Sequence, residues 1–148
     1  MQLLGSASIL WLPLSAGLLV QLYKFFFEWI KRRDFDLRVL ARAGGMPSSH
    51  AAMVCSLVSA IGYRTGPRSD LFALATLFAL IVMYDATGVR QAAGKQAVVL
   101  NQILRELFTG QPVSEEELKE LIGHSPTEVY VGALVGVLYT VLWFQLAS

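Results

Sequence analysis

Long apolar stretches are the feature of this sequence that most restricts its fold. Residues 8–30 and 126–146 are each long enough to cross a hydrocarbon core about 30 Å thick. Two shorter apolar stretches, 47–63 and 71–84, are joined by the turn sequence RTGPRSD and predict a helical hairpin. We therefore expect an all-α, multi-pass membrane bundle of about four transmembrane helices.

The composition also indicates a membrane protein. Hydrophobic residues make up 55% of the 148 residues and charged residues only 16%, too little charge to cover a soluble domain. This length predicts a single domain, 1–148. The net charge of +1 gives no basic field for nucleic acid, and one cysteine and two histidines exclude a disulfide framework and argue against a closed zinc site. We expect no metal and no other cofactor.

Positive residues are concentrated in two of the connections. Five Lys and Arg residues follow the first stretch and four lie between the third and fourth, whereas the hairpin turn has only Arg64 and Arg68. Cytoplasmic loops of membrane proteins are enriched in such residues. We therefore expect a protein of the cell (inner) membrane with residues 31–46 and 85–125 in the cytoplasm and both termini outside.

The segment 89–107 has its apolar residues on one helical stripe. This pattern predicts an amphipathic helix on the cytoplasmic side, lying on the membrane surface or against the bundle, with Arg105 facing solvent or headgroups. A short acidic helix is expected from Ser114. The stripe comprises Val89, Ala93, Ala97, Leu100, Leu104 and Leu107.

The sequence GGMPSSH, residues 44–50, is the first of three polar clusters that this topology places on one membrane face. Pro47 suits the first turn of a helix, so Ser48, Ser49 and His50 would lie among free amides that attract anions. These side chains could bind phosphate and move a proton. The alternative is a plain helix cap with an interfacial histidine.

The sequence GHSPTE, residues 123–128, is the second cluster. Ser125 and Glu128 fit a capping box around Pro126, which explains both residues structurally but leaves His124 without a structural role. Since His124 and Glu128 are four residues apart, the carboxylate is also placed to orient the imidazole, as catalytic histidines require. The two roles of Glu128 compete.

The third cluster, Asp85 with Arg90 and Lys95, follows the end of the third stretch. A salt-bridged membrane boundary would explain these charges. Charges retained close to lipid are nevertheless candidates for function.

The three clusters lie in the segments GGMPSSHAA, VMYDATGVRQAAGKQAVVLN and LKELIGHSPTEVYVGALVG. In these segments, in this order, the chain resembles the divergent PAP2 family, which is related to type 2 phosphatidic acid phosphatases, acid phosphatases and vanadium-dependent haloperoxidases. The resemblance implies a helical, metal-independent protein that hydrolyses phosphate esters through a phosphohistidine.

The resemblance also implies roles for both histidines. Pro47-Ser48-Ser49-His50 is similar to a Pro-Ser-Gly-His motif, which implies that His50 is the general acid. His124-x3-Glu128 resembles the end of a Ser-Arg-x5-His-x3-Asp motif, which implies a nucleophilic His124 oriented by Glu128.

Cations are expected to bind the phosphoryl oxygens. Leu118 stands where the third motif has its arginine, so Arg90 or Lys95 would supply that charge. Lys31 and Arg38 have the spacing of a Lys-x6-Arg-Pro motif, without the proline, and Arg42 competes for this role.

We therefore expect a phosphatase for a membrane lipid phosphate or diphosphate at the cytoplasmic face. The alternative is a non-catalytic lipid-phosphate binding or transport protein. The Gly132-x3-Gly136 spacing allows close helix packing, in the chain or in a homodimer. The expected catalytic residues are His124, His50 and Glu128, and the expected substrate-binding residues are Lys31, Arg38, Arg42, Ser48, Ser49, Asp85, Arg90 and Lys95.

Cysteine-accessibility labelling tests the predicted orientation. A Thr65→Cys variant carries its new thiol in the hairpin turn, on the side with two of the eleven loop cations. A membrane-impermeant reagent should therefore label it from outside the cell. Strong labelling from the cytoplasmic side only would reverse the orientation.

Overall fold

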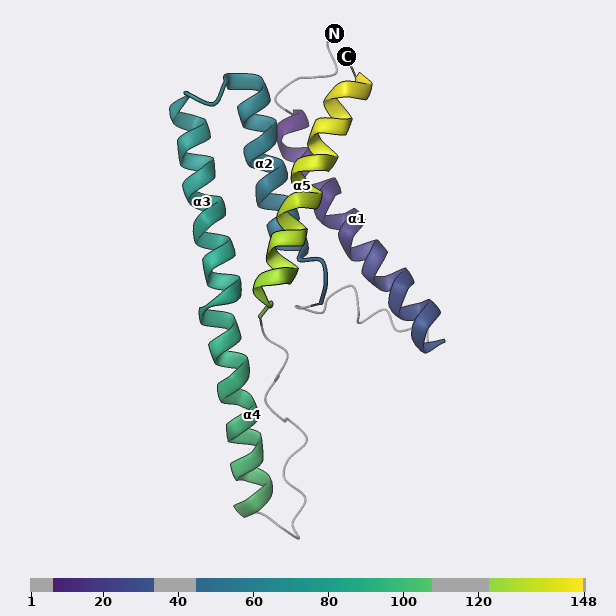
Figure 1. Cartoon of the computed structure of the whole chain (residues 1–148), viewed down its shortest axis with the longest axis vertical. Helices are drawn as coiled ribbons and strands as arrows, with labels where there is room; N and C mark the ends of the chain where they lie inside the picture. Colours follow the sequence, from purple (N-terminus) through teal and green to yellow (C-terminus); the bar gives the residue numbers. More distant parts are fainter. Residues whose placement is uncertain (1–6, 34–44, 108–122, 148) are drawn as a thin grey trace.

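The computed structural model describes residues 7–33, 45–107 and 123–147, and these residues form five helices and no strand (Figure 1). The predicted all-α fold is confirmed. Arg38, Arg42 and the acidic helix expected from Ser114 lie outside the described residues. The helices are α1 (Ala7–Arg32), α2 (Ser49–Thr65), α3 (Asp70–Thr87), α4 (Val89–Leu107) and α5 (Pro126–Ala147).

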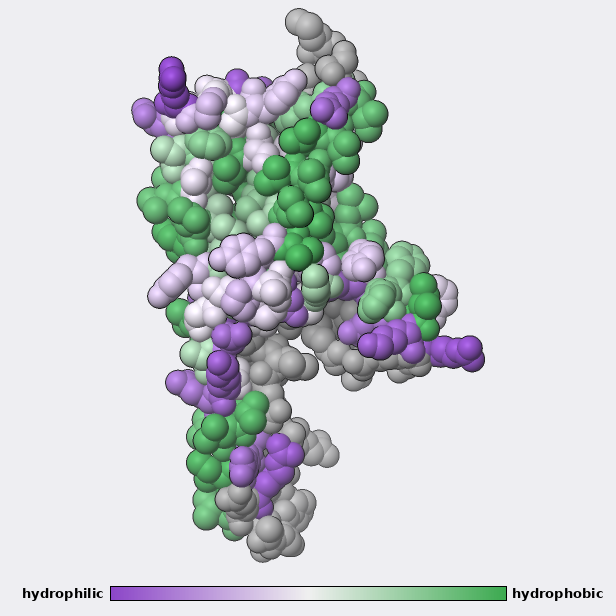
Figure 2. All heavy atoms as spheres, in the orientation of Figure 1, coloured by the Kyte–Doolittle hydropathy of each residue, from purple (hydrophilic) through white to green (hydrophobic). Residues whose placement is uncertain are grey.

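Three of the helical segments described are long and apolar enough to cross a membrane, namely Ile9–Lys31, Asp70–Arg105 and Pro126–Ala147. The shorter α2, of 17 residues, lies at the centre of the bundle and packs against α1, α3 and α5. On the face seen in Figure 2, apolar side chains form a band between two more polar rims. The structure is therefore approximately consistent with the expected four-helix bundle.

The polar clusters gather at one end of this bundle. The start of α1, the end of α5 and the α2–α3 turn lie at one end, and the starts of α2 and α5 lie at the other, beside the α3–α4 junction (Figure 1). The three polar clusters predicted to share one membrane face thus lie at one end of the bundle, in the described residues 45–50, 85–90 and 123–128.

Two glycines allow α5 to lie directly against α2. A Cβ atom added at Gly132 would collide with the backbone of Ser48, and one added at Gly136 would collide with that of Ala52. Small residues permit this backbone approach between membrane helices. The Gly132-x3-Gly136 spacing therefore serves packing within the chain, and because both glycines are buried there, the expected homodimer would need another surface.

The α2–α5 contact continues toward the other end through polar side chains. The hydroxyl groups of Ser56 and Thr140 are both buried and lie 2.7 Å apart, within hydrogen-bonding distance. Thr140 Oγ1 also donates to the Gly136 carbonyl in its own helix. These bonds satisfy hydroxyl groups that would be costly to leave unpaired within the apolar band.

Helix α4 is amphipathic, as predicted, but it continues the direction of α3 beyond the polar rim (Figure 1). It contacts no other described helix than α3. The Gly88 amide donates to the Tyr84 carbonyl and the Gly88 carbonyl accepts from the Ala92 amide, so the hydrogen bonding continues across the junction. The apolar side of α4 is visible below the rim in Figure 2 and includes the exposed residues Val99, Leu100, Ile103 and Leu107.

The α2–α5 contact predicts the effect of a Gly136→Leu substitution. The side chain would meet backbone atoms of α2, which cannot move aside as a flexible side chain can. We expect a loss of about 1–3 kcal/mol or more, as for other overpacked cores, measured as a lower Tm of the purified protein in detergent. The control is Val137→Leu, at an exposed position of the same helix. An unchanged Tm for Gly136→Leu would contradict the close contact.

Candidate phosphate site

Main-chain hydrogen bonds hold the three polar clusters together. The Ser48 amide, at the start of α2, donates to the Glu128 carbonyl of α5 over 2.9 Å. The His124 amide donates to the Ala86 carbonyl of α3 over 3.0 Å. Because these bonds involve backbone atoms, they fix the relative positions of the three helix ends independently of the side chains.

Helix α2 begins at Ser49, directly after its cap residue Ser48, and Pro47 lies before the cap. The Ser48 residue is the N-cap, and its Oγ accepts a hydrogen bond from the Ala51 amide over 3.3 Å. Pro47 precedes the cap and is not in the first turn, contrary to the expectation, because the serine side chain can accept this bond and proline cannot. His50 is exposed in the first turn.

A glycine brings His124 close to the α3–α4 junction. Gly123 has a φ of +114°, and an added Cβ atom would collide with the backbone of Arg90 and Gln91. Only glycine fits such a position without strain. This role of Gly123 was not predicted, although a glycine directly before a histidine with no structural role is a signal in the sequence.

Ser125 and Glu128 form the predicted capping box. The Ser125 amide donates to Glu128 Oε2 over 2.8 Å, and the Glu128 amide donates to Ser125 Oγ over 3.4 Å. Glu128 therefore caps the start of α5. Its negative charge also acts on the His124 imidazole.

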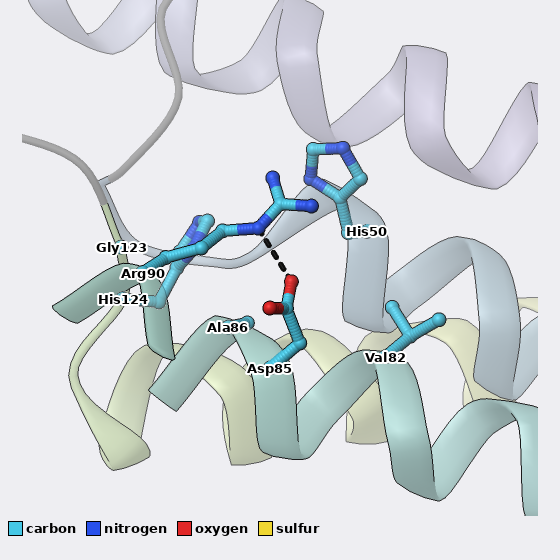
Figure 3. A pocket seen from close by; sticks show the side chains of 7 residues that line it. All are labelled: His50, Val82, Asp85, Ala86, Arg90, Gly123 and His124. Carbon is cyan, nitrogen blue, oxygen red and sulfur yellow. Dashed lines mark hydrogen bonds and ion pairs between the residues drawn. The ribbon is translucent and has the colours of Figure 1, made fainter. Parts of the chain in front are cut away.

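A small pocket brings His50 and His124 together, as expected from their positions at the same end of the bundle (Figure 3). The centroids of the two imidazole rings are 6.4 Å apart, and the ring planes are inclined by 74°. The two histidines, which are far apart in the sequence, therefore line one small pocket. The pocket is lined by His50, Val82, Asp85, Ala86, Arg90, Gly123 and His124.

His124 is the deeply buried member of this pocket. Its side chain is only 4% exposed, and its Nε2 atom has no hydrogen-bond partner among the described residues. Burial lowers the pKa of His124 below its ordinary value of 6.5, and the nearby charges of Lys24 and Arg90 lower it further against the opposing charge of Glu128. The His124 imidazole is therefore neutral at neutral pH, and its buried Nε2 atom is available for chemistry.

Asp85 and Arg90 both line the pocket and form an ion pair across the α3–α4 junction. Arg90 Nε lies 2.5 Å from Asp85 Oδ2. In Figure 3 the Arg90 side chain extends across the pocket from His124 toward His50. A guanidinium at this position can bind phosphoryl oxygens.

The other expected substrate-binding residues lie outside the pocket lining. Ser48 is buried at the helix crossing and Ser49 is half-buried beside it, while Lys31 and Lys95 are exposed on α1 and α4. The roles of these four residues in substrate binding stay predictions. Among the described residues, no group of three or more His, Cys, Asp or Glu side chains could hold a metal ion.

Lys24 is the site residue that the sequence analysis missed. It lies on α1, is only 8% exposed and has its aliphatic stem beside Gly45. Its charge acts on both histidines and on Glu128. A lysine within an apolar span is a functional candidate by default, and that signal was present in the sequence.

Comparison with known proteins supports one family. The model of the divergent PAP2 family matches residues 6–139, which include the pocket lining and Lys24. An uncharacterized membrane protein of Bacillus subtilis (strain 168), YuiD, is 37% identical over 140 residues, a match that covers 87% of this chain and 89% of that protein. No solved structure matches the chain. The family match and the extensive identity to YuiD establish that this chain belongs to the divergent PAP2 family.

Proposed function

We propose that this PAP2-related membrane protein is a metal-independent phosphatase that hydrolyses a lipid phosphate or diphosphate through a phosphohistidine. The proposal rests mainly on the environment of His124. Its imidazole is buried, its Nε2 atom has no partner among the described residues, and it shares a pocket with His50 and Arg90. Leaving a buried polar atom unpaired is costly, and a site of chemistry is one setting in which it persists.

His124 is the nucleophile in this proposal. Its neutral imidazole attacks phosphorus, a nitrogen–phosphorus bond forms, and the bond from phosphorus to the lipid oxygen breaks. The imidazole becomes positively charged in this step. The carboxylate of Glu128, whose charge acts on His124 from the first turn of α5, stabilises that positive charge.

His50 is the proton donor. It faces the same pocket from the first turn of α2 and is exposed to solvent. Protonated His50 gives its proton to the departing lipid alkoxide. Neutral His50 then takes a proton from the water that attacks the phosphohistidine, which releases inorganic phosphate and regenerates His124.

Arg90 and Lys24 stabilise the charged phosphoryl oxygens during both steps. Arg90 lines the pocket, and the charge of Lys24 acts on both histidines. Stabilisation of developing phosphoryl charge is usually the largest catalytic contribution.

The position of the pocket favours a lipid substrate at the cytoplasmic face. The residues that line the pocket come from helix ends at one end of the bundle (Figure 1), where more polar side chains border the apolar band (Figure 2). A lipid headgroup would lie at such a boundary. Exposed apolar side chains of α3, including Ile81 and Tyr84, lie near this level. The excess of Lys and Arg in the two connections at this end supports the cytoplasmic orientation.

Phosphate release from a panel of lipids tests the proposal. The purified protein in detergent is given phosphatidic acid, phosphatidylglycerol phosphate or a polyprenyl diphosphate, with and without chelator. We expect release of inorganic phosphate from at least one lipid, and a loss of roughly 1000-fold or more in His124→Gln, because the nucleophile is removed. The variant should keep its Tm and its elution volume in gel filtration.

Near-normal hydrolysis by His124→Gln would contradict the covalent mechanism. Binding of lipid phosphate without release of inorganic phosphate by the unmodified protein would support the non-catalytic binding or transport protein instead. The use of the Glu128 carboxylate in the helix cap favours that alternative, because a carboxylate hydrogen-bonded to His124 would orient a nucleophile more firmly.

A Glu128→Gln substitution separates the structural and electrostatic roles of this residue. Glutamine can still complete the capping box, so the Tm should stay nearly unchanged. We expect turnover to fall about tenfold, because the charge that stabilises the His124 imidazolium is lost. If turnover is unchanged in Glu128→Gln, the role of Glu128 is purely structural.

The pH profile of kcat/KM tests the role of Lys24. Because the pKa of His124 is lowered by burial and by neighbouring cations, the acidic limb of the profile should lie below pH 6.5. Lys24→Met removes one of these positive charges, so the pKa of His124 should rise and the limb should move to higher pH. Arg68→Met, which removes an exposed cation from the α2–α3 turn at the other end of the bundle, is the control. A shift to lower pH in Lys24→Met would contradict this arrangement.

A further inference from the structure

The ion pair in the pocket uses only one edge of the Arg90 guanidinium. A guanidinium has five N–H donors, one on Nε and four on the two terminal nitrogens. The bond to Asp85 Oδ2 is made by Nε. In Figure 3 the two terminal nitrogens extend past the carboxylate toward the His50 side of the pocket. The paired donors that best match phosphate geometry are therefore directed into the pocket and away from Asp85.

Without Asp85, little in the described structure would hold this guanidinium in place. Arg90 lies in the first turn of α4, its side chain is 49% exposed, and α4 contacts no described helix other than α3. Exposed arginine side chains sample many rotamers, and binding a ligand with such a side chain requires that freedom to be lost. A carboxylate that fixes Nε removes most of this freedom before the ligand arrives.

We infer that Asp85 is a positioning residue that holds Arg90 through Nε so that its two terminal nitrogens bind the non-bridging oxygens of the phosphoryl group. This inference rests on the proposed function and adds the mode of anion recognition to it. Bidentate recognition by the terminal nitrogens gives both affinity and a fixed orientation of the phosphoryl group.

The opposite role for Asp85 is that of a competitor, because its carboxylate lines the same pocket and could repel an anion. Two observations favour positioning. A competitor would gain most by occupying the terminal nitrogens, whereas the observed bond leaves them free of the carboxylate. The Asp85 side chain is also 36% exposed, so solvent screens its repulsion of a neighbouring anion.

A double-mutant cycle with inorganic phosphate as the probe distinguishes the two roles. Calorimetry measures phosphate binding to the purified full chain, to Asp85→Ala, to Arg90→Ala and to the double variant. We expect Asp85→Ala to weaken binding roughly tenfold, because the ordering of Arg90 must then accompany binding. In the Arg90→Ala background the same substitution should cause no further loss, because nothing remains to be positioned.

Two further variants control for charge and for folding. Asp85→Asn keeps an oxygen that accepts from Nε, so it should retain most of the affinity that Asp85→Ala loses. Asp70→Ala removes an exposed carboxylate at the far end of the same helix and should leave phosphate binding unchanged.

Each contrary result has a distinct meaning. Tighter phosphate binding by Asp85→Ala would overturn positioning and identify Asp85 as a competitor. If Asp85→Ala weakens phosphate binding equally in the unmodified protein and in Arg90→Ala, positioning is also overturned, and the role of Asp85 is to stabilise the fold. If the unmodified protein binds no phosphate, the inference and the proposed function fail together. If it binds phosphate but releases none from lipids, only the proposed hydrolysis fails, and the cycle still decides the role of Asp85.

Discussion

The direct contact between the backbones of α2 and α5 is the interaction on which the candidate site depends. Gly132 and Gly136 allow this approach because they place no Cβ atom between the helices. The contact sets the two helix starts at the same depth, where the Ser48 amide reaches the Glu128 carbonyl. His50 and His124 then occupy one pocket because each lies within a few residues of its helix start. Wider helix spacing would separate the imidazoles without altering either local sequence.

The bundle also determines which polar residues have a structural explanation. Helix starts have unpaired amides that need acceptors, so Ser48, Ser125 and Glu128 are accounted for by capping. His124 and Lys24 satisfy no such requirement, and both are buried next to an apolar band that disfavours them. Buried polar residues beyond those that cap the helices are candidates for binding and chemistry.

The sequence predicted those features that depend on local patterns. Hydropathy predicted the membrane helices, and the spacing of Ser125 and Glu128 predicted the capping box, because both involve neighbouring residues. The proximity of Lys24 to the histidines and the direction of α4 were not predicted. The first depends on how helices distant in sequence pack together, and the second on how α3 and α4 meet at Gly88. Neither hydropathy nor cap spacing determines these arrangements.

The charges around the pocket connect anion binding to proton transfer. The carboxylates of Glu128 and Asp85 offset part of the positive charge that Lys24 and Arg90 offer to an incoming phosphate. The negative charge of a bound phosphate therefore favours the protonated form of the exposed His50. In the proposed mechanism, a substrate that brings its own negative charge would thus protonate His50, the proposed proton donor, at the moment when the proton is needed. Burial lowers the pKa of His124, so the neutral form that the proposed attack on phosphorus requires is favoured at neutral pH.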